Sequence, residues 1–349
     1  MPSSSIRDAF LVDGVRTAIG AFGGSLAHSR PDDLAAHVMQ RLLDRYPTFD
    51  REQIADVILG CANQAGEDNR NVARMSLLLA GLPMSIPGQT VNRLCASGLT
   101  AVASAAAGVR LADGDVYLAG GVESMTRVPI VSDQGPMSPV LMERYEIIPQ
   151  IESADRIATK WNFSRERLDT FALESQRRAV KAIDDGVFKK EIVNVPLDAN
   201  GHVAWTGAAA KEVSVDEHPR RDTTLEKLAS LNPALGTKAI TAGNSSGIND
   251  AACAVLVASR DAAKKHGWKP RARVTHWVSV GSDPTLMLTG PMPATKMVLK
   301  EAGLTVGDID LFEINEAFAS VPLAWMHDLD VDHARVNVNG GAIALGHPL

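Results

Sequence analysis

Cys95 is the residue of this sequence with the strongest claim to do chemistry. It follows a short apolar run and stands at the mouth of an alanine-rich segment, Asn92-Arg-Leu-Cys-Ala-Ser-Gly-Leu-Thr-Ala101. A helix N-terminus supplies unpaired N–H groups and partial positive charge, which favour a thiolate over a thiol. The position therefore predicts a nucleophile. Cys61 and Cys253 stand in apolar runs and suit the alternative, a small buried hydrophobe.

A thiol nucleophile needs a base, and His347 is the best placed of the nine histidines. It lies in a glycine-rich turn after an apolar run, Asn339-Gly-Gly-Ala-Ile-Ala-Leu-Gly-His-Pro348, where small residues let a ligand come close. Other histidines, such as His28 and His333, stand among charged residues. We interpret His347 as a general base, with a purely structural histidine as the alternative.

Asn315 closes a short apolar run, residues 310–314, for which a strand is expected, and opens the motif Asn315-Glu-Ala-Phe-Ala319. An amide at a strand end beside a cleft can hold a water or donate to an oxyanion. Asparagine also caps helices commonly, and a helix is expected to follow here. The residue types alone leave both roles open.

The sharpest rival to Cys95 is Ser245, in Gly243-Asn-Ser-Ser-Gly247. This pentapeptide matches the G-x-S-x-G nucleophile elbow, and we expect a strand over 238–241 before it and a helix from Asp250 after it. A serine hydrolase with Ser245 as nucleophile and His347 as base is therefore an alternative function. Against it, the pattern is short, and no HGGG-type oxyanion loop is present.

The elements that must position these residues alternate in type. Apolar runs predict strands, and amphipathic or alanine-rich runs predict helices. The strands are expected over 8–12, 55–60, 89–91 and 116–119, and the helices over 32–43, 71–80, 96–112 and 164–184. Residues 126–150 predict loops with one helix, residues 187–235 are polar and turn-rich, and the alternation returns from 271. The pattern indicates an α/β fold.

The two α/β parts resemble each other. Residues 53–63 are similar to 307–315, and residues 90–98 are similar to 337–346; each is a strand followed by a polar or small-residue turn. The similarity favours a duplicated fold whose halves present their loops to a common cleft.

Composition limits the function classes. The 349 residues carry a formal charge of −6, with 45% hydrophobic and 22% charged residues, so the chain is globular and has no general attraction to nucleic acid or anionic membranes. Three scattered cysteines exclude a disulfide framework and a four-cysteine zinc site. Without a Walker loop, a dinucleotide fingerprint, a secretory signal or an apolar span of ~18–20 residues, we expect a soluble cytoplasmic protein that binds neither ATP nor NAD.

Five ordered blocks make the chain resemble the thiolase family of acyl-CoA:acetyl-CoA C-acyltransferases. They begin at residues Asn92, Ala119, Thr241, Asn315 and Asn337. The resemblance covers essentially the whole chain. It implies a five-layer αβαβα sandwich of two similar halves, with an N-terminal half from 1–125 and 251–270, an inserted CoA-binding loop domain over 126–250, and a C-terminal half over 271–349. It also implies a homodimer or homotetramer.

The resemblance assigns roles to individual residues. Cys95 is expected to take the acyl group as a thioester, His347 to activate it, and Asn315 to hold a water in an oxyanion hole. Three further matches, Arg220, Ala242 and Ser246, are expected to line the coenzyme A site. The implied chemistry is a ping-pong Claisen condensation or its thiolytic reverse, as in fatty acid metabolism. Coenzyme A and acetyl-CoA are substrates, and no metal or bound cofactor is implied.

Two departures from the family pattern bear on the function. Short-chain biosynthetic members carry His-Met-Gly where this chain has Pro149-Gln-Ile151, and the block over 60–74 is similar to 3-oxoadipyl-CoA thiolases. Family members also continue past the position of Leu349 to a Cys-x-Gly loop with a second catalytic cysteine, so the C-terminal half is expected to be truncated. An inactive acyl-CoA-binding protein is therefore a further alternative. Ketoacyl synthases are excluded, because Asn315 stands where they need a histidine.

Overall fold

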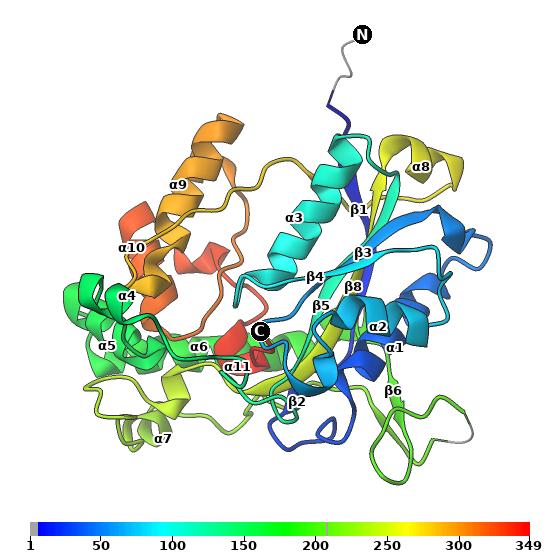
Figure 1. Ribbon diagram of the computed structural model, residues 1–349. Helices are drawn as coiled ribbons and strands as arrows, with labels where there is room; N and C mark the ends of the chain where they lie inside the picture. Colours follow the sequence, from blue (N-terminus) through cyan, green and yellow to red (C-terminus); the bar gives the residue numbers. More distant parts are fainter. Residues whose placement is uncertain (1–5, 207–208) are drawn as a thin grey trace.

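The computed structural model describes residues 6–206 and 209–349, and within these residues it contains one seven-stranded mixed sheet (Figure 1). Its order is β4-β3-β5-β8-β1-β9, and the two-residue β2 pairs with β8 beside β1. The strands run over Gly88–Val91 (β4), Ile54–Gly60 (β3), Val116–Ser124 (β5), Asn249–Ser259 (β8), Ala9–Arg16 (β1), Ala272–Val274 (β9) and Gly20–Ala21 (β2). A separate two-stranded sheet joins Val195–Leu197 (β6) to Lys211–Val213 (β7).

Strand direction decides which ends of the strands meet. β4, β3 and β5 are mutually parallel, with Gly60 opposite both Val91 and Gly121, whereas β8 runs antiparallel to β5. The carboxyl ends of β3, β4 and β5 and the beginning of β8 therefore share one edge of the sheet. The predicted nucleophile follows β4, so it belongs to this edge.

Helices cover both faces of the sheet, which is why β5 is apolar and buried almost throughout. On one face lies α3 (Ser97–Arg110), whose alanines pack on residues of β3, β5 and β8. On the other face lie α1 (Pro31–Leu43) and α2 (Val72–Leu79), which bury leucines and Met39 against the sheet. The sheet and these three helices thus form a three-layer α/β unit, to which the first 124 residues and the segment over 249–274 contribute.

The remaining helices gather beside this unit, on the side of α5 and α9 in Figure 1. They are α4 (Pro139–Arg144), α5 (Gln150–Lys160), α6 (Arg165–Asp184), α7 (Leu225–Ala229), α9 (Pro291–Ala302), α10 (Ser320–Leu329) and α11 (Ala342–Leu345); α8 (Arg260–Lys265) follows β8. A second apolar core joins α5, α6 and α10. Short 3₁₀ turns occur at Arg51–Gln53, Gly66–Asp68, Val187–Lys190, Ala242–Asn244, Met287–Thr289, Val306–Asp308 and His333–Arg335.

Most predicted elements are confirmed in place and type, including β1, α1, β3, α2, β4, α3, β5 and α6. Four predictions are wrong. The alternation of strands and helices expected from 271 onward is not found: the described residues there contain one strand, β9, followed by helices and short turns. Residues 238–241 form no strand, the expected helix from Asp250 is strand β8, and the expected strand over 310–314 is reduced to a single parallel bridge between Phe312 and Val336. Over the described parts of the chain, no helix is long and apolar enough to cross a membrane.

Candidate active site

The nucleophile turn is built where β3, β4 and α3 come together. A Cβ atom added to Gly60, the last residue of β3, would lie 2.4 Å from the backbone nitrogen of Gly98 in the first turn of α3. Only glycine allows this approach. The close packing places the segment between Val91 and Ser97, and with it Cys95, directly over the carboxyl end of β3.

Asn92 fixes the strained part of that turn. Leu94 has a φ of +48°, a conformation that L residues adopt rarely. The side-chain oxygen of Asn92 accepts a hydrogen bond from the Leu94 N–H at 2.9 Å, and its Nδ2 donates to the Ala62 carbonyl at 2.9 Å. The Ser97 hydroxyl donates to the Leu94 carbonyl at 2.6 Å. The turn that carries Cys95 is therefore held on both sides.

A buried glutamate lies beneath the nucleophile turn. Glu123, near the end of β5, is 1% exposed and accepts hydrogen bonds from the N–H groups of Ala62 and Asn63 and from Asn63 Nδ2, at 2.8–3.1 Å. Burial raises the pKa of the Glu123 carboxyl, and these donors oppose the shift. Because Asn92 also bonds to Ala62, Glu123 and the Cys95 turn are two parts of one network.

The thiol of Cys95 is not stabilised as a thiolate, which differs from the expectation for a helix mouth. Burial raises the pKa of Cys95 above its ordinary value near 9, and the charge of Glu123 adds to the rise. The Gln150 side chain, at the start of α5, acts in the opposite direction and lowers the pKa of the thiol. Desolvation therefore outweighs the helix terminus, and Cys95 needs a base to become a nucleophile.

His347 has the properties of such a base. Burial lowers its pKa to about 4, so the imidazole is neutral at physiological pH. Its backbone N–H donates to the Oδ1 of the fully buried Asn249 at 3.0 Å. Gly346 has a φ of +101°, and a Cβ there would lie 2.5 Å from the Asn249 amide, so glycine is required at this position.

Asn315 and His347 meet although 32 residues separate them. Asn315 Nδ2 lies 3.2 Å from His347 Nε2. Because the amide nitrogen is a donor, Nε2 is the acceptor in this contact, and the proton of the neutral ring is assigned to Nδ1. The predicted oxyanion residue and the predicted base thus form a direct pair.

This pair and Cys95 lie at the same edge of the sheet. Asn249, which holds His347, is the first residue of β8, and its carbonyl accepts a hydrogen bond from the Met125 N–H at 3.4 Å. Met125 follows β5 two residues after Glu123, whose charge acts on the Cys95 thiol. The carboxyl end of β5 therefore connects the two halves of the site.

The three residues expected at the coenzyme A site lie in two places. Ala242 is the first residue of a 3₁₀ turn, and Ser246 follows two residues after its end. The Ser246 N–H donates to the Ala317 carbonyl at 2.9 Å, beside the Asn315 segment. Arg220 lies farther out, exposed at the α6 side. It lines a 390 Å³ cavity that also contains Arg177 and Arg221.

Ser245 lacks the geometry of a hydrolase nucleophile. The Ser245 hydroxyl donates to the Thr241 carbonyl at 2.7 Å, and the residue forms a bridge with Phe318. A nucleophile elbow is a strand–turn–helix unit, whereas here a 3₁₀ turn leads into strand β8. The pentapeptide is therefore part of the wall beside residues 315–319.

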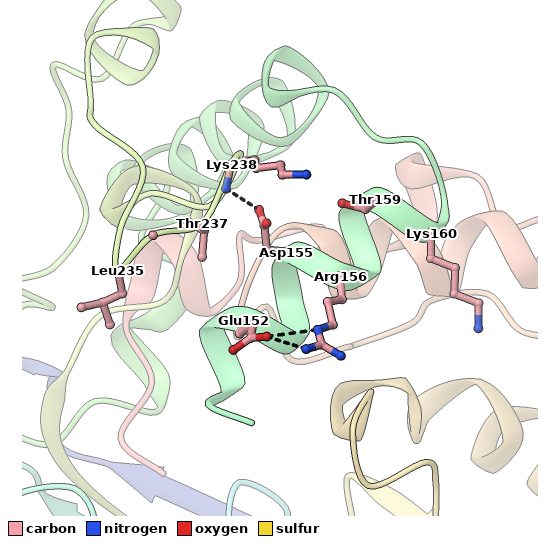
Figure 2. A pocket seen from close by; sticks show the side chains of 9 residues that line it. Glu152, Asp155, Arg156, Thr159, Lys160, Leu235, Thr237 and Lys238 are labelled. Atoms are coloured by element: carbon pink, nitrogen blue, oxygen red, sulfur yellow. Dashed lines mark hydrogen bonds and ion pairs between the residues drawn. The ribbon is translucent and has the colours of Figure 1, made fainter. Parts of the chain in front are cut away.

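A second cavity, of 490 Å³, opens between α5 and residues 235–238 (Figure 2). The side chains of Glu152 and Arg156 pair across one side of it, and Asp155 accepts from the Lys238 N–H at 3.0 Å. None of the predicted site residues lines it. The cavity is lined by α5, the helix that begins at Gln150, whose side chain lowers the pKa of the Cys95 thiol.

Several residues of the site escaped sequence reasoning: Asn92, Glu123, Gln150, Asn249 and Glu316. They are polar side chains that act on backbone groups or on the thiol, so neither spacing nor composition reveals their partners. In the described parts of the chain, no group of three or more His, Cys, Asp or Glu could hold a metal ion.

Family models and known proteins match this chain nearly from end to end. The model "Thiolase, N-terminal domain" matches residues 9–261, and "Thiolase, C-terminal domain" matches residues 268–349. Beta-ketoadipyl-CoA thiolase of Pseudomonas aeruginosa is 47% identical over 98% of this chain and 89% of that protein. A steroid 3-ketoacyl-CoA thiolase of Mycobacterium tuberculosis is 43% identical over 99% of this chain and 84% of that protein.

A solved structure agrees with these matches. The crystal structure of the Bacillus anthracis acetyl-CoA acetyltransferase has a TM-score of 0.86 and 36% identity, over 99% of this chain and 89% of that one. The predicted thiolase-like α/β sandwich is confirmed by this likeness. Thiolases take acyl-CoA substrates and need no bound cofactor, which confirms the prediction on cofactors. The chain belongs to the thiolase family.

Proposed function

We propose that this thiolase carries its acyl group on Cys95, with His347 as the base and Asn315 as its partner. The observation that carries the proposal is the neutral His347 imidazole, which is paired with Asn315 at the sheet edge that also holds Cys95. Neither the buried thiol nor the imidazole ionises readily alone, so the proton has to move between them when substrate arrives.

The steps follow from these protonation states. The Cys95 thiol gives its proton to His347 Nε2 as the sulfur attacks the thioester carbonyl of an acyl-CoA. Collapse of the tetrahedral intermediate breaks the carbon–sulfur bond to coenzyme A, and the leaving thiolate takes the proton from the imidazolium. Asn315 Nδ2 faces the same space and is suited to hold the water that donates to the oxyanion. In thiolysis the Cys95 sulfur instead attacks the 3-oxo carbonyl of a 3-oxoacyl-CoA, the carbon–carbon bond breaks, and the departing acetyl-CoA carbanion takes the proton from the imidazolium. The acyl group then passes to the coenzyme A thiol, whose proton goes to His347 and from there to the released Cys95 sulfur. Condensation is the reverse: His347 removes the α-proton of acetyl-CoA, the enolate takes the acyl group from Cys95, and the Cys95 sulfur takes up the proton.

We propose 3-oxoadipyl-CoA as the substrate class. Two features support it: the block over 60–74 and the replacement of His-Met-Gly by residues 149–151. Proteins named beta-ketoadipyl-CoA thiolase are 47% identical to this chain, as is the 3-oxoadipyl-CoA/3-oxo-5,6-dehydrosuberyl-CoA thiolase of Escherichia coli. These names point to dicarboxylic acyl chains rather than to the fatty acid metabolism expected at first.

Selectivity for the terminal carboxylate tests this substrate proposal. We expect kcat/KM for thiolysis of 3-oxoadipyl-CoA to exceed that of 3-oxohexanoyl-CoA at least ~10-fold, because a site built for a polar group rejects an analogue that lacks it. The two chains have equal length, so the comparison isolates the carboxylate. Equal values, or a preference for 3-oxohexanoyl-CoA, would refute the assignment.

Arg220 is proposed to bind the phosphates of coenzyme A, because a guanidinium pairs well with phosphate. Its guanidinium is exposed at the cavity it lines, whereas that of the neighbouring Arg221 is held by Asp184 at 2.7 and 2.9 Å. We expect Arg220→Ala to raise KM about 10-fold with kcat nearly unchanged, since a charge-assisted hydrogen bond contributes ~1.5–3 kcal/mol. Arg221→Ala is the matched control. An unchanged KM in Arg220→Ala would remove Arg220 from the site.

A homodimer is proposed as the assembly. β4 is an edge strand, and large apolar side chains around it are open to solvent: Met84 is 82%, Leu94 62% and Leu99 75% exposed. Unpaired edges and apolar patches of this kind favour pairing with a second copy. Light scattering should give twice the chain mass, and Leu99→Arg should give the single mass. The domain boundaries and the cytoplasmic location stay predictions.

A further inference from the structure

A buried carboxylate belongs to the residue that follows Asn315 in the chain. Glu316 is 1% exposed. Its Oε1 accepts from Asn337 Nδ2 at 2.8 Å, and its Oε2 accepts from the Ser175 hydroxyl at 2.7 Å and from the Ile343 N–H at 3.1 Å. The carboxylate therefore joins α6, the turn at Asn337 and the segment that leads to the C-terminal histidine.

One arm of this network holds the segment that ends at Asn315. Asn337, whose φ is +46°, exchanges two hydrogen bonds with the backbone of Ile314, at 2.9 and 2.8 Å. The Asn337 N–H also donates to the Phe312 carbonyl at 2.9 Å. Because Glu316 fixes the Asn337 amide, it fixes the backbone one residue before Asn315.

The other arm holds the turn that leads to His347. The Gly341 N–H donates to the Ser175 hydroxyl oxygen at 3.1 Å, and a Cβ at Gly341 would lie 2.2 Å from the Glu316 carboxyl carbon. α11 begins at the next residue and ends two residues before His347. The backbone at Gly341 thus packs directly against the Glu316 carboxylate, and the position of α11 depends on this contact.

Burial raises the pKa of the Glu316 carboxyl, and its hydrogen-bond donors oppose that rise. Burying a charged carboxylate costs free energy, which its hydrogen bonds offset. Losing one hydrogen-bond donor leaves a buried polar group without a partner. The two arms are therefore coupled, since both depend on the same two oxygens.

We propose that Glu316 is a positioning residue, which holds Asn315 and His347 at their 3.2 Å contact by clamping the segments that carry them. The inference rests on the proposed role of His347 as the base. It adds that the base is set by a carboxylate that touches neither substrate nor sulfur. A shift of about 1 Å in a reacting group can cost ~10²-fold in rate, so the clamp should matter for the proton transfer and not for substrate binding.

The test measures acylation of Cys95 by acetyl-CoA in a single turnover, in parallel with alkylation of Cys95 by iodoacetamide at alkaline pH. Alkylation at high pH needs no base, because hydroxide forms the thiolate. Glu316→Gln replaces one carboxylate oxygen by an NH₂ group, which would face the hydrogen-bond donors that now contact Glu316. We expect this variant to slow acylation ~10–10²-fold, while KM and the alkylation rate stay within about 2-fold of wild type. Glu313→Gln, an exposed carboxylate three residues earlier, is the matched control.

A double variant separates positioning from general damage. If Glu316 acts through His347 and Asn315, Glu316→Gln should slow the His347→Ala enzyme much less than it slows the wild type. Equal slowing in both backgrounds, or a normal acylation rate in Glu316→Gln, would overturn the inference. Should Glu316→Gln not fold, Ser175→Ala removes one partner only, and it should show the same selective loss on a smaller scale; wild-type acylation in a folded Ser175→Ala would count against the clamp. If His347→Ala alone acylates normally, the proposed function fails instead.

Discussion

Replacing Cys95 by alanine is expected to abolish acyl transfer, with a loss in kcat of roughly 10⁴-fold or more, as for other covalent catalysts that lose their nucleophile. The reason is that the covalent step has no substitute. Neither Ser245 nor Cys61 can replace Cys95 as nucleophile, because the Ser245 hydroxyl is hydrogen-bonded to the Thr241 carbonyl and Cys61 is fully buried. The rate is measured as coenzyme A release from acetyl-CoA and as thiolysis of a 3-oxoacyl-CoA.

The matched control is Cys253→Ala. Cys253 is a half-buried thiol within β8, and its replacement also removes one sulfur. Cys253→Ala should keep near wild-type turnover. Binding of coenzyme A to Cys95→Ala should stay within a few-fold, because Arg220, Ala242 and Ser246 are untouched. Turnover above about 1% of wild type in Cys95→Ala would contradict the assignment of the nucleophile.

Replacing His347 by alanine is expected to slow acylation of Cys95 by ~10²–10⁴-fold at neutral pH, the usual contribution of a positioned general base. The effect should be large because burial raises the pKa of Cys95 above its ordinary value near 9, so very little thiolate exists at pH 7 without help. Single-turnover acylation measures it directly, and His202→Ala, an exposed histidine, is the control.

The acylation rate should depend on pH differently in the wild type and in His347→Ala. The pKa of His347 is lowered to about 4 in the folded enzyme, so the wild-type imidazole stays neutral and active until the pH falls toward 4. The wild-type acylation rate should therefore show no loss between pH 8 and 6. In His347→Ala the rate should rise about 10-fold per pH unit across that range, since hydroxide has to form the thiolate. A wild-type inflection near pH 6.5 would show that the imidazole is not desolvated.

The sequence predicted the first half of the fold well, because its elements have clear periods. The alanine-rich α3 and the apolar β3 and β5 each lie within a few residues of the expected range. The errors fall on short apolar runs with small residues. Residues 250–258 fit a helix or a strand equally well locally, and only pairing with β1 and β5 makes them β8. Such partners lie more than a hundred residues away in the chain.

The site was predictable only in its chemical groups. Cys95 and His347 stood out by residue type and by their place in turns that contain glycine, and Asn315 stood out by its place at the end of an apolar run. The protonation state of Cys95 could not be predicted from the sequence. Its place at a helix N-terminus suggested a thiolate, but burial in the folded protein raises the pKa of Cys95 and favours the thiol. Glu123, Asn249 and Glu316 were missed for a related reason: each is buried and acts on backbone atoms that only the folded chain brings near.

Mapping the acyl group on the enzyme identifies the nucleophile. The protein is mixed with acetyl-CoA, quenched in acid to keep a thioester, digested and analysed by mass spectrometry, with Cys95→Ala treated in parallel. If Cys95 is the nucleophile, we expect one acetyl group on the peptide that contains Cys95 and none on the peptide that contains Ser245. The Cys95→Ala protein should carry no stable adduct. An acetyl group on Ser245, or a turning-over enzyme that never carries acetyl on Cys95, would contradict this assignment.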